Sequence, residues 1–321
     1  ALHQLNSPFL LHGMQRAVDL VLDAKNKGQS IVVYGDYDAD GICASAILLS
    51  ALQDLGVSAS SYIPDRAGEG YGLNAEAVRQ LSSQAGLLIT VDCGITALEE
   101  TALAASLGMR VILTDHHSLP ETLPGADAVV HPLLADYPDP QLCGAGVAWK
   151  LACALLGEDK ALNGLELAAV GTIADMVPLT GENRIIAALG LERLRDTGSP
   201  GLRALMRAAG MKAGESVQSD QVAFQLAPRL NAAGRLATAR GALRLLLTRD
   251  PEEADDIAGQ LDLLNRERRE IENKVLREAA AAMRGMDLSS LRSLVIAGEE
   301  WNPGVIGLAA GKLAERWNYP T

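Results

Sequence analysis

Short strand-like runs alternate with longer helix-like segments along the first part of the chain. Residues 31–35, 59–63, 87–91, 110–113 and 128–131 predict strands. Apolar residues recur with a helical period over residues 11–28, 42–55, 75–84 and 97–107. Strand–helix alternation of this kind is typical of crossover connections between parallel strands. We therefore predict an α/β fold, in which helices cover both faces of a parallel sheet.

Helical patterns dominate the rest of the chain, from residue 145 to about 209 and again from 251 to about 284. The second stretch is densely charged and has no proline after Pro251, so we expect one long helix that links two domains. Beyond it, residues 294–297 predict a strand and 306–317 a helix. This organisation predicts a first domain over 1–250, a linker helix over 251–287 and a second α/β domain starting at 288. Because the chain lacks an initial Met and stops after a βα unit, we expect a fragment with a truncated second domain.

Composition narrows the class of protein. The chain has 321 residues, 48% of them hydrophobic and only 3% aromatic, which indicates a large aliphatic core. No apolar run is long enough to span a membrane. Four cysteines without paired spacing predict free thiols in the cytoplasm, not a zinc knot: Cys43, Cys93, Cys143 and Cys153. The net charge of −12 argues against non-specific coating of nucleic acid, but it is compatible with a nuclease whose acids bind metal.

Three carboxylates at alternate positions follow the first strand, at Asp36, Asp38 and Asp40. On an extended segment they would point the same way, and Gly41 would then permit a tight turn into the next helix. Three like charges this close repel one another unless a cation or a shared proton offsets them. The alternative is a turn with an Asp N-cap. We interpret the pattern as a divalent metal site.

Two further strands end in residues of the same kind. Asp92 follows one strand, and the sequence Asp115-His116-His117 follows the next. Each alone would be ordinary, as a helix cap or a surface histidine pair. Because ligands bind at the carboxyl ends of parallel strands, we expect these side chains to converge. Mixed carboxylate and imidazole ligands suit Mn²⁺ and also admit Mg²⁺, Co²⁺ or Zn²⁺, and several acids can hold two ions. The residues thus predict a metal-dependent phosphoester or phosphoanhydride hydrolase.

These residues also carry a family resemblance, which spans nearly the whole chain. Four segments resemble, in order, the motifs of the DHH phosphoesterase superfamily: residues 36–41, 91–94, 115–117 and 171–179. Five others resemble the RecJ family of single-strand-specific 5′→3′ exonucleases: residues 63–66, 70–73, 144–148, 228–235 and 301–307. The last of these resembles the start of that family's second catalytic domain.

The resemblance implies a site with two Mn²⁺ or Mg²⁺ ions. Its expected ligands are Asp38, Asp40, Asp92, His116 and Asp175. Asp92 would bridge the ions, and Asp36 would be a ligand or a close neighbour of one. His117 would face the scissile phosphate, and Asp115 would orient an imidazole, as carboxylates behind a metal site often do. Asp175 is expected from the resemblance alone.

Three arginines and an asparagine are candidates for substrate binding: Arg66, Arg229, Arg235 and Asn231. A guanidinium group pairs with phosphate through two parallel hydrogen bonds, which suits a DNA backbone or a terminal 5′ phosphate. The alternative for Arg66 and Arg229 is a surface salt bridge. Arg235 is the stronger candidate, because it stands beside Asn231 and Gly234 in a segment predicted to be a loop.

The resemblance implies an exonuclease that degrades single-stranded DNA to mononucleotides in DNA repair and recombination. Its partner would be single-stranded DNA, with a single-stranded-DNA-binding protein and a helicase as candidate protein partners and no membrane. Two alternatives remain. One is a DHH phosphodiesterase for short oligonucleotides or cyclic dinucleotides, although the long helix favours an enzyme with room for a strand. The other is a non-catalytic scaffold of replication, which would be expected to lose ligands; none of the five is lost.

Overall fold

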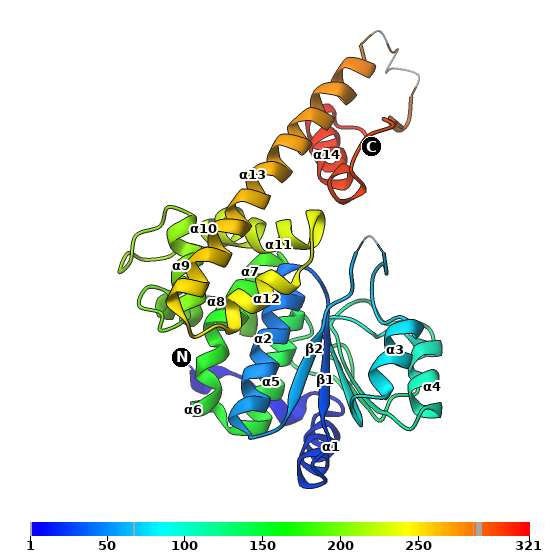
Figure 1. The fold of residues 1–321 in the computed structure, drawn as a ribbon, viewed down its shortest axis with the longest axis vertical. Helices are drawn as coiled ribbons and strands as arrows, with labels where there is room; N and C mark the ends of the chain where they lie inside the picture. Colours follow the sequence, from blue (N-terminus) through cyan, green and yellow to red (C-terminus); the bar gives the residue numbers. More distant parts are fainter. Residues whose placement is uncertain (1, 67, 285, 287–290) are drawn as a thin grey trace.

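A parallel sheet lies at the centre of the first part of the chain (Figure 1). The structure is a computed structural model that describes residues 2–66, 68–284, 286 and 291–321. Within these residues, five parallel strands form one sheet of order β2-β1-β3-β4-β5. The strands are β1 (Ile31–Gly35), β2 (Ala59–Tyr62), β3 (Leu87–Val91), β4 (Arg110–Thr114) and β5 (Ala128–Val130). The predicted parallel α/β sheet is confirmed.

Helices cover both faces of this sheet. The flanking helices are α1 (Met14–Asn26), α2 (Ala39–Asp54), α3 (Ala75–Ser82), α4 (Leu98–Ser106) and α5 (Gly144–Leu156). Along β1, Val33 packs into the core shared with α1, α2 and α5, while Val32 and Tyr34 pack into a second core shared with α3 and α4. Side chains of a strand alternate between faces, so a run apolar at every position fills both cores.

A helical region packs against α2 and α5 on the side away from α3 and α4 (Figure 1). Its helices are α6 (Glu158–Ala161), α7 (Leu165–Ala174), α8 (Gly181–Leu194), α9 (Pro200–Ala208), α10 (Ser219–Gln221), α11 (Ala227–Leu236) and α12 (Arg240–Leu247). Short 3₁₀ turns occur at Leu2–Gln4, Pro8–Leu10 and Leu162–Gly164, and a π-helical turn at Val222–Leu226 leads into α11. The segment with Asn231 and Arg235 is therefore a helix, and its prediction as a loop is wrong.

One long helix leaves the helical region and carries the C-terminal part of the chain (Figure 1). This helix, α13 (Pro251–Ala282), has 32 residues, and α14 (Pro303–Trp317) packs against it. The expected long helix is present, whereas the predicted strand at 294–297 is wrong, because these residues are not paired with any described strand. The expected boundary between linker and second domain, at 287–288, lies outside the described residues. The division into domains stays a prediction.

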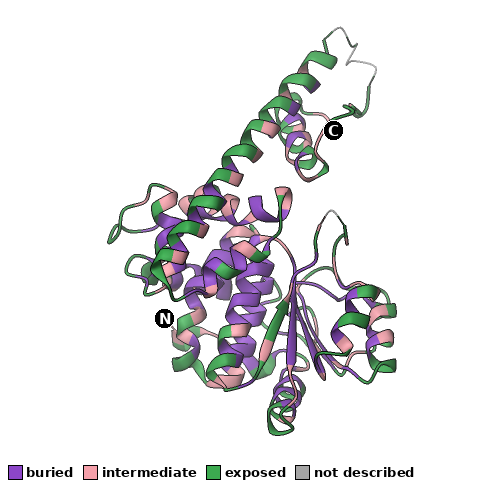
Figure 2. Ribbon diagram, viewed as in Figure 1, coloured by how far each residue is buried: buried purple, intermediate pink, exposed green. Residues whose placement is uncertain are grey.

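Burial is concentrated around the sheet and the helices that touch it. Figure 2 shows α2, α5 and the central strands mostly buried, while the far part of α13 is largely exposed. All four cysteines are buried free thiols, as the spacing predicts. In the part of the chain that the structure describes, none of the helices combines the length and the apolar character needed to cross a bilayer.

A buried ion pair connects α5 to α8. Lys150 and Glu182 are each 2% exposed, and their charged atoms lie 2.5 Å apart. The Lys150 ammonium also donates to the Asn6 carbonyl at 2.7 Å, and Glu182 accepts from the Asn6 amide and the Tyr137 hydroxyl. The pair therefore joins two helices, the N-terminal segment and the loop after β5.

We expect Lys150→Met to lower the free energy of unfolding by about 3–5 kcal/mol, because it leaves the Glu182 carboxylate buried without its cation. Urea denaturation measures the change. Arg195→Ala is the matched control, since Arg195 forms an exposed pair with Asp196 and should have little effect. A loss no larger for Lys150→Met than for the control would contradict a structural role for the buried pair.

Candidate metal centre

The strand register aligns three acids along the carboxyl edge of the sheet, the edge where the strands end. The last residues of β1, β3 and β4 pair directly with one another. The residues that follow are therefore neighbours: Asp36, Asp92 and Asp115. His131 follows β5 at the same level, since the end of β5 pairs with the end of β4. The convergence expected from the sequence follows directly from this register.

The first acidic motif is a turn and a helix start, not an extended segment. Asp38 is the N-cap of α2, and its Oδ1 accepts hydrogen bonds from the amides of Asp40 at 2.9 Å and Gly41 at 3.1 Å. Because α2 begins at Ala39, Asp40 lies in its first turn. The expectation of three acids alternating along a strand is wrong, and Asp38 is a helix cap. The cap uses one carboxylate oxygen, so it does not exclude a second role.

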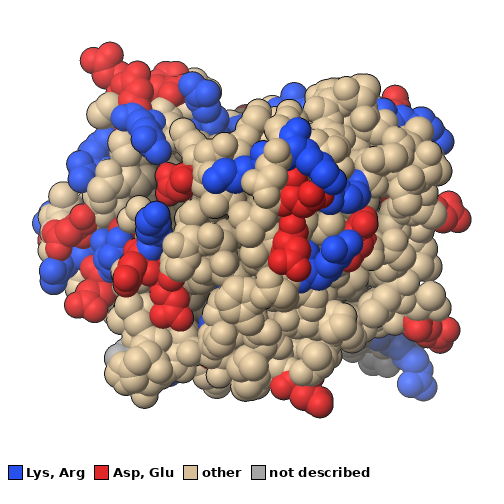
Figure 3. Space-filling model, turned by 90° about the horizontal axis from the view of Figure 1, so that it is seen from below, with Lys and Arg blue, Asp and Glu red and all other residues tan. Residues whose placement is uncertain are grey.

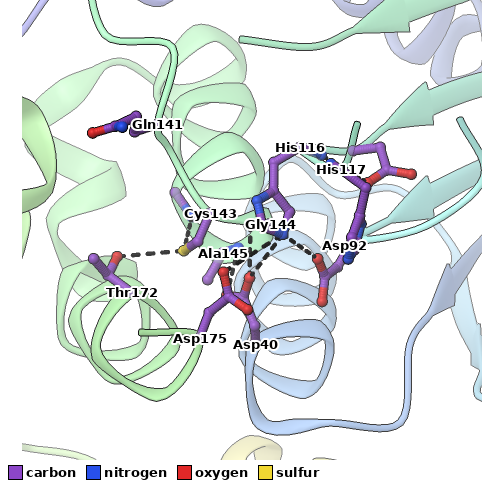
Figure 4. Close-up of polar contacts among 12 residues, drawn as sticks. Asp40, Asp92, His116, His117, Gln141, Cys143, Gly144, Ala145, Thr172 and Asp175 are labelled. Atoms are coloured by element: carbon purple, nitrogen blue, oxygen red, sulfur yellow. Dashed lines mark hydrogen bonds and ion pairs between the residues drawn. The ribbon is translucent and has the colours of Figure 1, made fainter. Parts of the chain in front are cut away.

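The predicted ligands nevertheless come together. Three groups have ligand atoms within 4.8 Å of one another: Asp36, Asp38 and Asp92; Asp40, His116 and Asp175; Asp92, His116 and His117. The His116 Nε2 atom lies 3.1 Å from Asp92 Oδ1, 3.7 Å from Asp175 Oδ2 and 3.9 Å from Asp40 Oδ2 (Figure 4). Asp92 and His116 thus connect the groups, and Asp175 reaches them from the end of α7.

Several atoms of this cluster are buried without a hydrogen-bond partner among the described residues. They are Asp36 Oδ1, Asp92 Oδ1 and His116 Nε2. Burial, with a smaller effect of His117, lowers the pKa of His116 to about 4, so its imidazole is neutral at neutral pH. The His116 Nε2 and the Asp92 Oδ1, which lie 3.1 Å apart, are both atoms of the kinds that bind divalent cations. A buried polar atom without a partner costs about 1–3 kcal/mol, and a divalent cation would satisfy all three. The residues fit a metal centre.

The acids of the cluster resist ionisation in the absence of a cation. Burial and the neighbouring Asp38 raise the pKa of Asp36 to about 7 and that of Asp175 to about 6. Burial and mutual repulsion also raise the pKa values of Asp40 and Asp92 above the ordinary range. A divalent ion binds the ionised carboxylates, so metal binding should release protons.

Asp115 orients His117. Its carboxylate accepts from the His117 Nδ1 at 2.7 Å and from the amides of Ile95, His116 and His117. Burial alone would raise the pKa of Asp115, but these hydrogen bonds hold it below its ordinary value. In return, the hydrogen bond to Asp115 raises the pKa of His117. His117 is 45% exposed, so its ring is available to a ligand.

His131 fixes the backbone of His117, and it is not among the site residues predicted from the sequence. The His131 ring is fully buried, and its Nε2 donates to the His117 carbonyl oxygen at 2.9 Å. Its Nδ1 accepts from the Leu133 amide at 3.1 Å. The only signal in the sequence is its position directly after a strand, which Asp92 and Asp115 share.

Backbone amides also contact the cluster. The amides of Gly144 and Ala145, at the start of α5, donate to Asp40 Oδ2 at 2.7 Å and Oδ1 at 2.9 Å (Figure 4). These residues belong to a segment selected by resemblance, but no role was predicted for them. Amides carry no side-chain signal, so the sequence alone could not assign these bonds.

The predicted substrate residues lie in different places. Arg66 and Arg235 line one cavity of about 830 Å³ together with Arg240 and residues 302–304. Arg235 also donates from Nη1 to the Gly304 carbonyl at 2.9 Å. Arg229 does not join them, because it pairs with Asp262 and donates to two backbone carbonyls, and its side chain is only 11% exposed. Its guanidinium therefore fixes α11 against α13.

Asn231 does not line the cavity. It contacts the segment 36–40 that carries Asp36, Asp38 and Asp40, which we call the acidic loop. Its Oδ1 accepts from the Ala39 amide at 2.7 Å. Three residues later, Gly234 lies so close to this loop that a methyl group on it would approach the Tyr37 carbonyl oxygen to 2.6 Å. Helix α11 thus lies directly between the acidic loop and the start of α14.

Comparison with known proteins agrees with this geometry. Residues 30–172 match the model of the DHH family, N-terminal domain. A solved structure of exonuclease RecJ bound to manganese is 40% identical, with a TM-score of 0.90 over 98% of this chain and 80% of that one. The chain belongs to the RecJ family.

Two further members of the RecJ family support the assignment. The single-stranded-DNA-specific exonuclease RecJ of Bacillus subtilis is 46% identical over 98% of this chain. The RecJ of Thermus thermophilus, solved in complex with Mn²⁺, is 39% identical with a TM-score of 0.85 over 95% of this chain. This chain spans only 40% of the length of the Bacillus protein and 45% of the solved Thermus chain.

We expect Asp36→Asn to stabilise the metal-free protein increasingly as pH rises. The pKa of Asp36 rises from an ordinary 3.8 to about 7 in the fold, so its contribution to stability is present below pH 3.8 and lost as pH rises through 7. The difference in unfolding free energy, variant minus wild type, should therefore grow over this range by up to about 1.4 kcal/mol per pH unit. Urea denaturation with a chelator present measures it.

Glu121→Gln, which removes an exposed acid outside the cluster, is measured in parallel as the control. A difference between Asp36→Asn and wild type that stays constant from acid to neutral pH would mean that Asp36 ionises normally in the fold.

Proposed function

We propose that this chain is the metal-dependent catalytic part of an exonuclease that hydrolyses single-stranded DNA 5′→3′ to mononucleotides. The observation that carries the proposal is the cluster of buried carboxylates and a neutral imidazole, three of whose atoms have no hydrogen-bond partner among the described residues. The printed names of the RecJ relatives support the substrate, and the direction of the reaction is that of the resembling family. This chain spans less than half the length of these two relatives, so the activity of a whole RecJ protein is assigned to it here only as a proposal.

The proposed metal ligands are Asp38, Asp40, Asp92, His116 and Asp175, with Asp36 as a further ligand or close neighbour. We assign two Mn²⁺ or Mg²⁺ ions to them, as the solved relatives with Mn²⁺ and Mg²⁺ support. When bound, two divalent ions neutralise charge on a phosphodiester and make a water molecule more acidic. Asp92 would be the bridging ligand. It and His116 each belong to two of the three groups, but a carboxylate has two oxygens to offer, whereas His116 reaches the acids through one nitrogen, Nε2.

His117 is the proposed contact to the scissile phosphate. The Asp115 carboxylate accepts from the His117 Nδ1 at 2.7 Å, and this hydrogen bond raises the pKa of His117 and so favours the cationic imidazole. A cationic imidazole can donate a hydrogen bond to a phosphate oxygen or a proton to a leaving oxygen. The carbonyl contact from His131 fixes the backbone of this residue.

Arg66 and Arg235 are the proposed contacts to the DNA backbone. Both side chains line the same cavity, and both lie near Tyr37. The Arg66 guanidinium is 5.3 Å from the centre of the Tyr37 ring. Arg235 belongs to α11, which packs against the Tyr37 carbonyl oxygen. The face seen from below, at the other end of the sheet, carries basic and acidic side chains in mixture (Figure 3). The cavity lined by Arg66, Arg235 and Arg240 is a local concentration of positive charge, which is compatible with a net charge of −12.

We propose that residues 1–250 form the DHH domain, that α13 is the linker and that a second catalytic domain begins near residue 288. We propose a cytoplasmic role in DNA repair and recombination, with a single-stranded-DNA-binding protein and a helicase as protein partners.

We expect the chain, with Mn²⁺, to release mononucleotides from a 5′-labelled single strand of about 30 nucleotides, longer than a single binding module covers. The matching duplex and a dinucleotide are measured beside it. Asp92→Ala should abolish the release while circular dichroism shows an intact fold. Cleavage of the dinucleotide alone would indicate a phosphodiesterase for short substrates, and activity that survives thorough chelation would contradict the metal mechanism.

Arg235→Ala should weaken the binding of the same single strand by about tenfold or more, because a guanidinium–phosphate contact contributes roughly 1.5–3 kcal/mol. Fluorescence anisotropy measures the dissociation constant, and Mn²⁺ affinity should stay unchanged. Lys27→Ala is the control, since Lys27 is exposed at the end of α1, next to the opposite end of the sheet. Equal affinities for both variants would remove Arg235 from the substrate path.

A further inference from the structure

The start of α5 is built to hold a carboxylate. The first amides of a helix have no partner within it. In α5, those of Gly144 and Ala145 donate to the two oxygens of Asp40, and the third, of Gly146, donates to the Cys143 sulfur at 3.4 Å. Asp40 comes from α2, more than a hundred residues earlier, so these bonds connect two helices at the metal centre.

Gly144 also touches a second acid of the cluster. A methyl group added to Gly144 would lie 2.5 Å from both the Cβ and the Oδ1 of Asp92. These distances are far below van der Waals contact, and Asp92 is buried directly after β3. The absence of a side chain at residue 144 therefore allows α5 to bind Asp40 and to pack against Asp92 at once.

Gly171 of α7 makes the corresponding approach from another side. A methyl group on it would lie 2.5 Å from Asp40 Oδ1 and 2.5 Å from the Cβ of Ala145. Asp40 is thus enclosed between the amides of α5 and the backbone of α7. Gly146 differs, since a methyl group there would meet nothing closer than 3.4 Å, an ordinary contact.

We propose that Gly144 and Gly171 are positioning residues for the metal centre. Their backbones hold the carboxylates of Asp40 and Asp92 in the orientation that the ions require, and a side chain at either residue displaces an acid. The inference rests on the proposed function, because it concerns the ligands assigned there. The two glycines act through the carboxylates that they position.

Helix propensity alone does not penalise alanine at these residues. Alanine favours a helix over glycine by about 1 kcal/mol, so Gly→Ala at an unobstructed helical residue stabilises or is neutral. Gly146→Ala is the matched control, since it makes the same change in the same turn of α5 without touching an acid. A loss specific to Gly144→Ala then reports the contact with Asp92, and one at Gly171→Ala reports the close approach of α7 to Asp40 and to Ala145 of α5.

The test is calorimetric titration of Mn²⁺ into the metal-free chain and its three variants, with urea denaturation of each metal-free form. We expect Gly146→Ala to bind Mn²⁺ like the wild type. Gly144→Ala and Gly171→Ala should bind it at least about tenfold more weakly, since partners behind metal ligands typically contribute about 10–100-fold in affinity. The urea curves identify any variant that is not folded; if Gly144→Ala is unfolded, Gly171→Ala carries the test from α7.

Two results would overturn the inference, and they are distinguishable. Folded Gly144→Ala and Gly171→Ala that bind Mn²⁺ as tightly as Gly146→Ala would refute the positioning role and leave the proposed function intact. A wild-type chain that binds no Mn²⁺ would refute the proposed metal centre itself, and the positioning role with it.

Discussion

Repulsion among buried carboxylates is the constraint on which the rest of this structure depends. The aligned ends of β1, β3 and β4 place three acids side by side, and α2 and α7 add Asp40 and Asp175. The fold offsets part of this repulsion with backbone amides, which reach Asp40 from α5 and Asp115 from the following turn. What remains unsatisfied among the described residues is a small set of buried oxygens and one imidazole nitrogen, and a divalent cation would satisfy these together.

The parts of the site that the sequence predicts are those fixed by sheet geometry. Acids that follow parallel strands must meet, so Asp92 and Asp115 could be expected from the strand pattern alone. Asp175 could not, because it follows a helix, and only the family motif indicates it. The sequence places the start of α2 too late, because an aspartate can cap a helix or extend a strand end equally well.

The sequence also does not distinguish the two roles open to Arg229. The same side chain could pair with an acid, as it does with Asp262 of α13, or bind a phosphate. The strand expected at 294–297 has suitable residues, but a strand also needs a paired neighbour, which the described residues do not supply.

Helix α11 joins the metal centre to the C-terminal part of the chain. One side of it contacts the acidic loop through Asn231 and Gly234, and the other contacts the Gly304 carbonyl through Arg235. The Arg235 side chain is therefore fixed at its backbone, which belongs to α11, and at its guanidinium, which donates to the Gly304 carbonyl. A phosphate that binds Arg235 would be held by this fixed side chain. Less conformational entropy is lost when such a side chain binds than when a free surface arginine does.

The order of the ligands along the chain has a consequence for biosynthesis. Asp36, Asp38 and Asp92 are all present once β3 has left the ribosome, whereas the group of Asp40, His116 and Asp175 waits for the end of α7. A domain generally folds as a unit, so neither group is held in place while the chain is still short of α7. The full set of ligands is therefore available only after Asp175 has left the ribosome. Metal loading is then a late event in the synthesis of this domain.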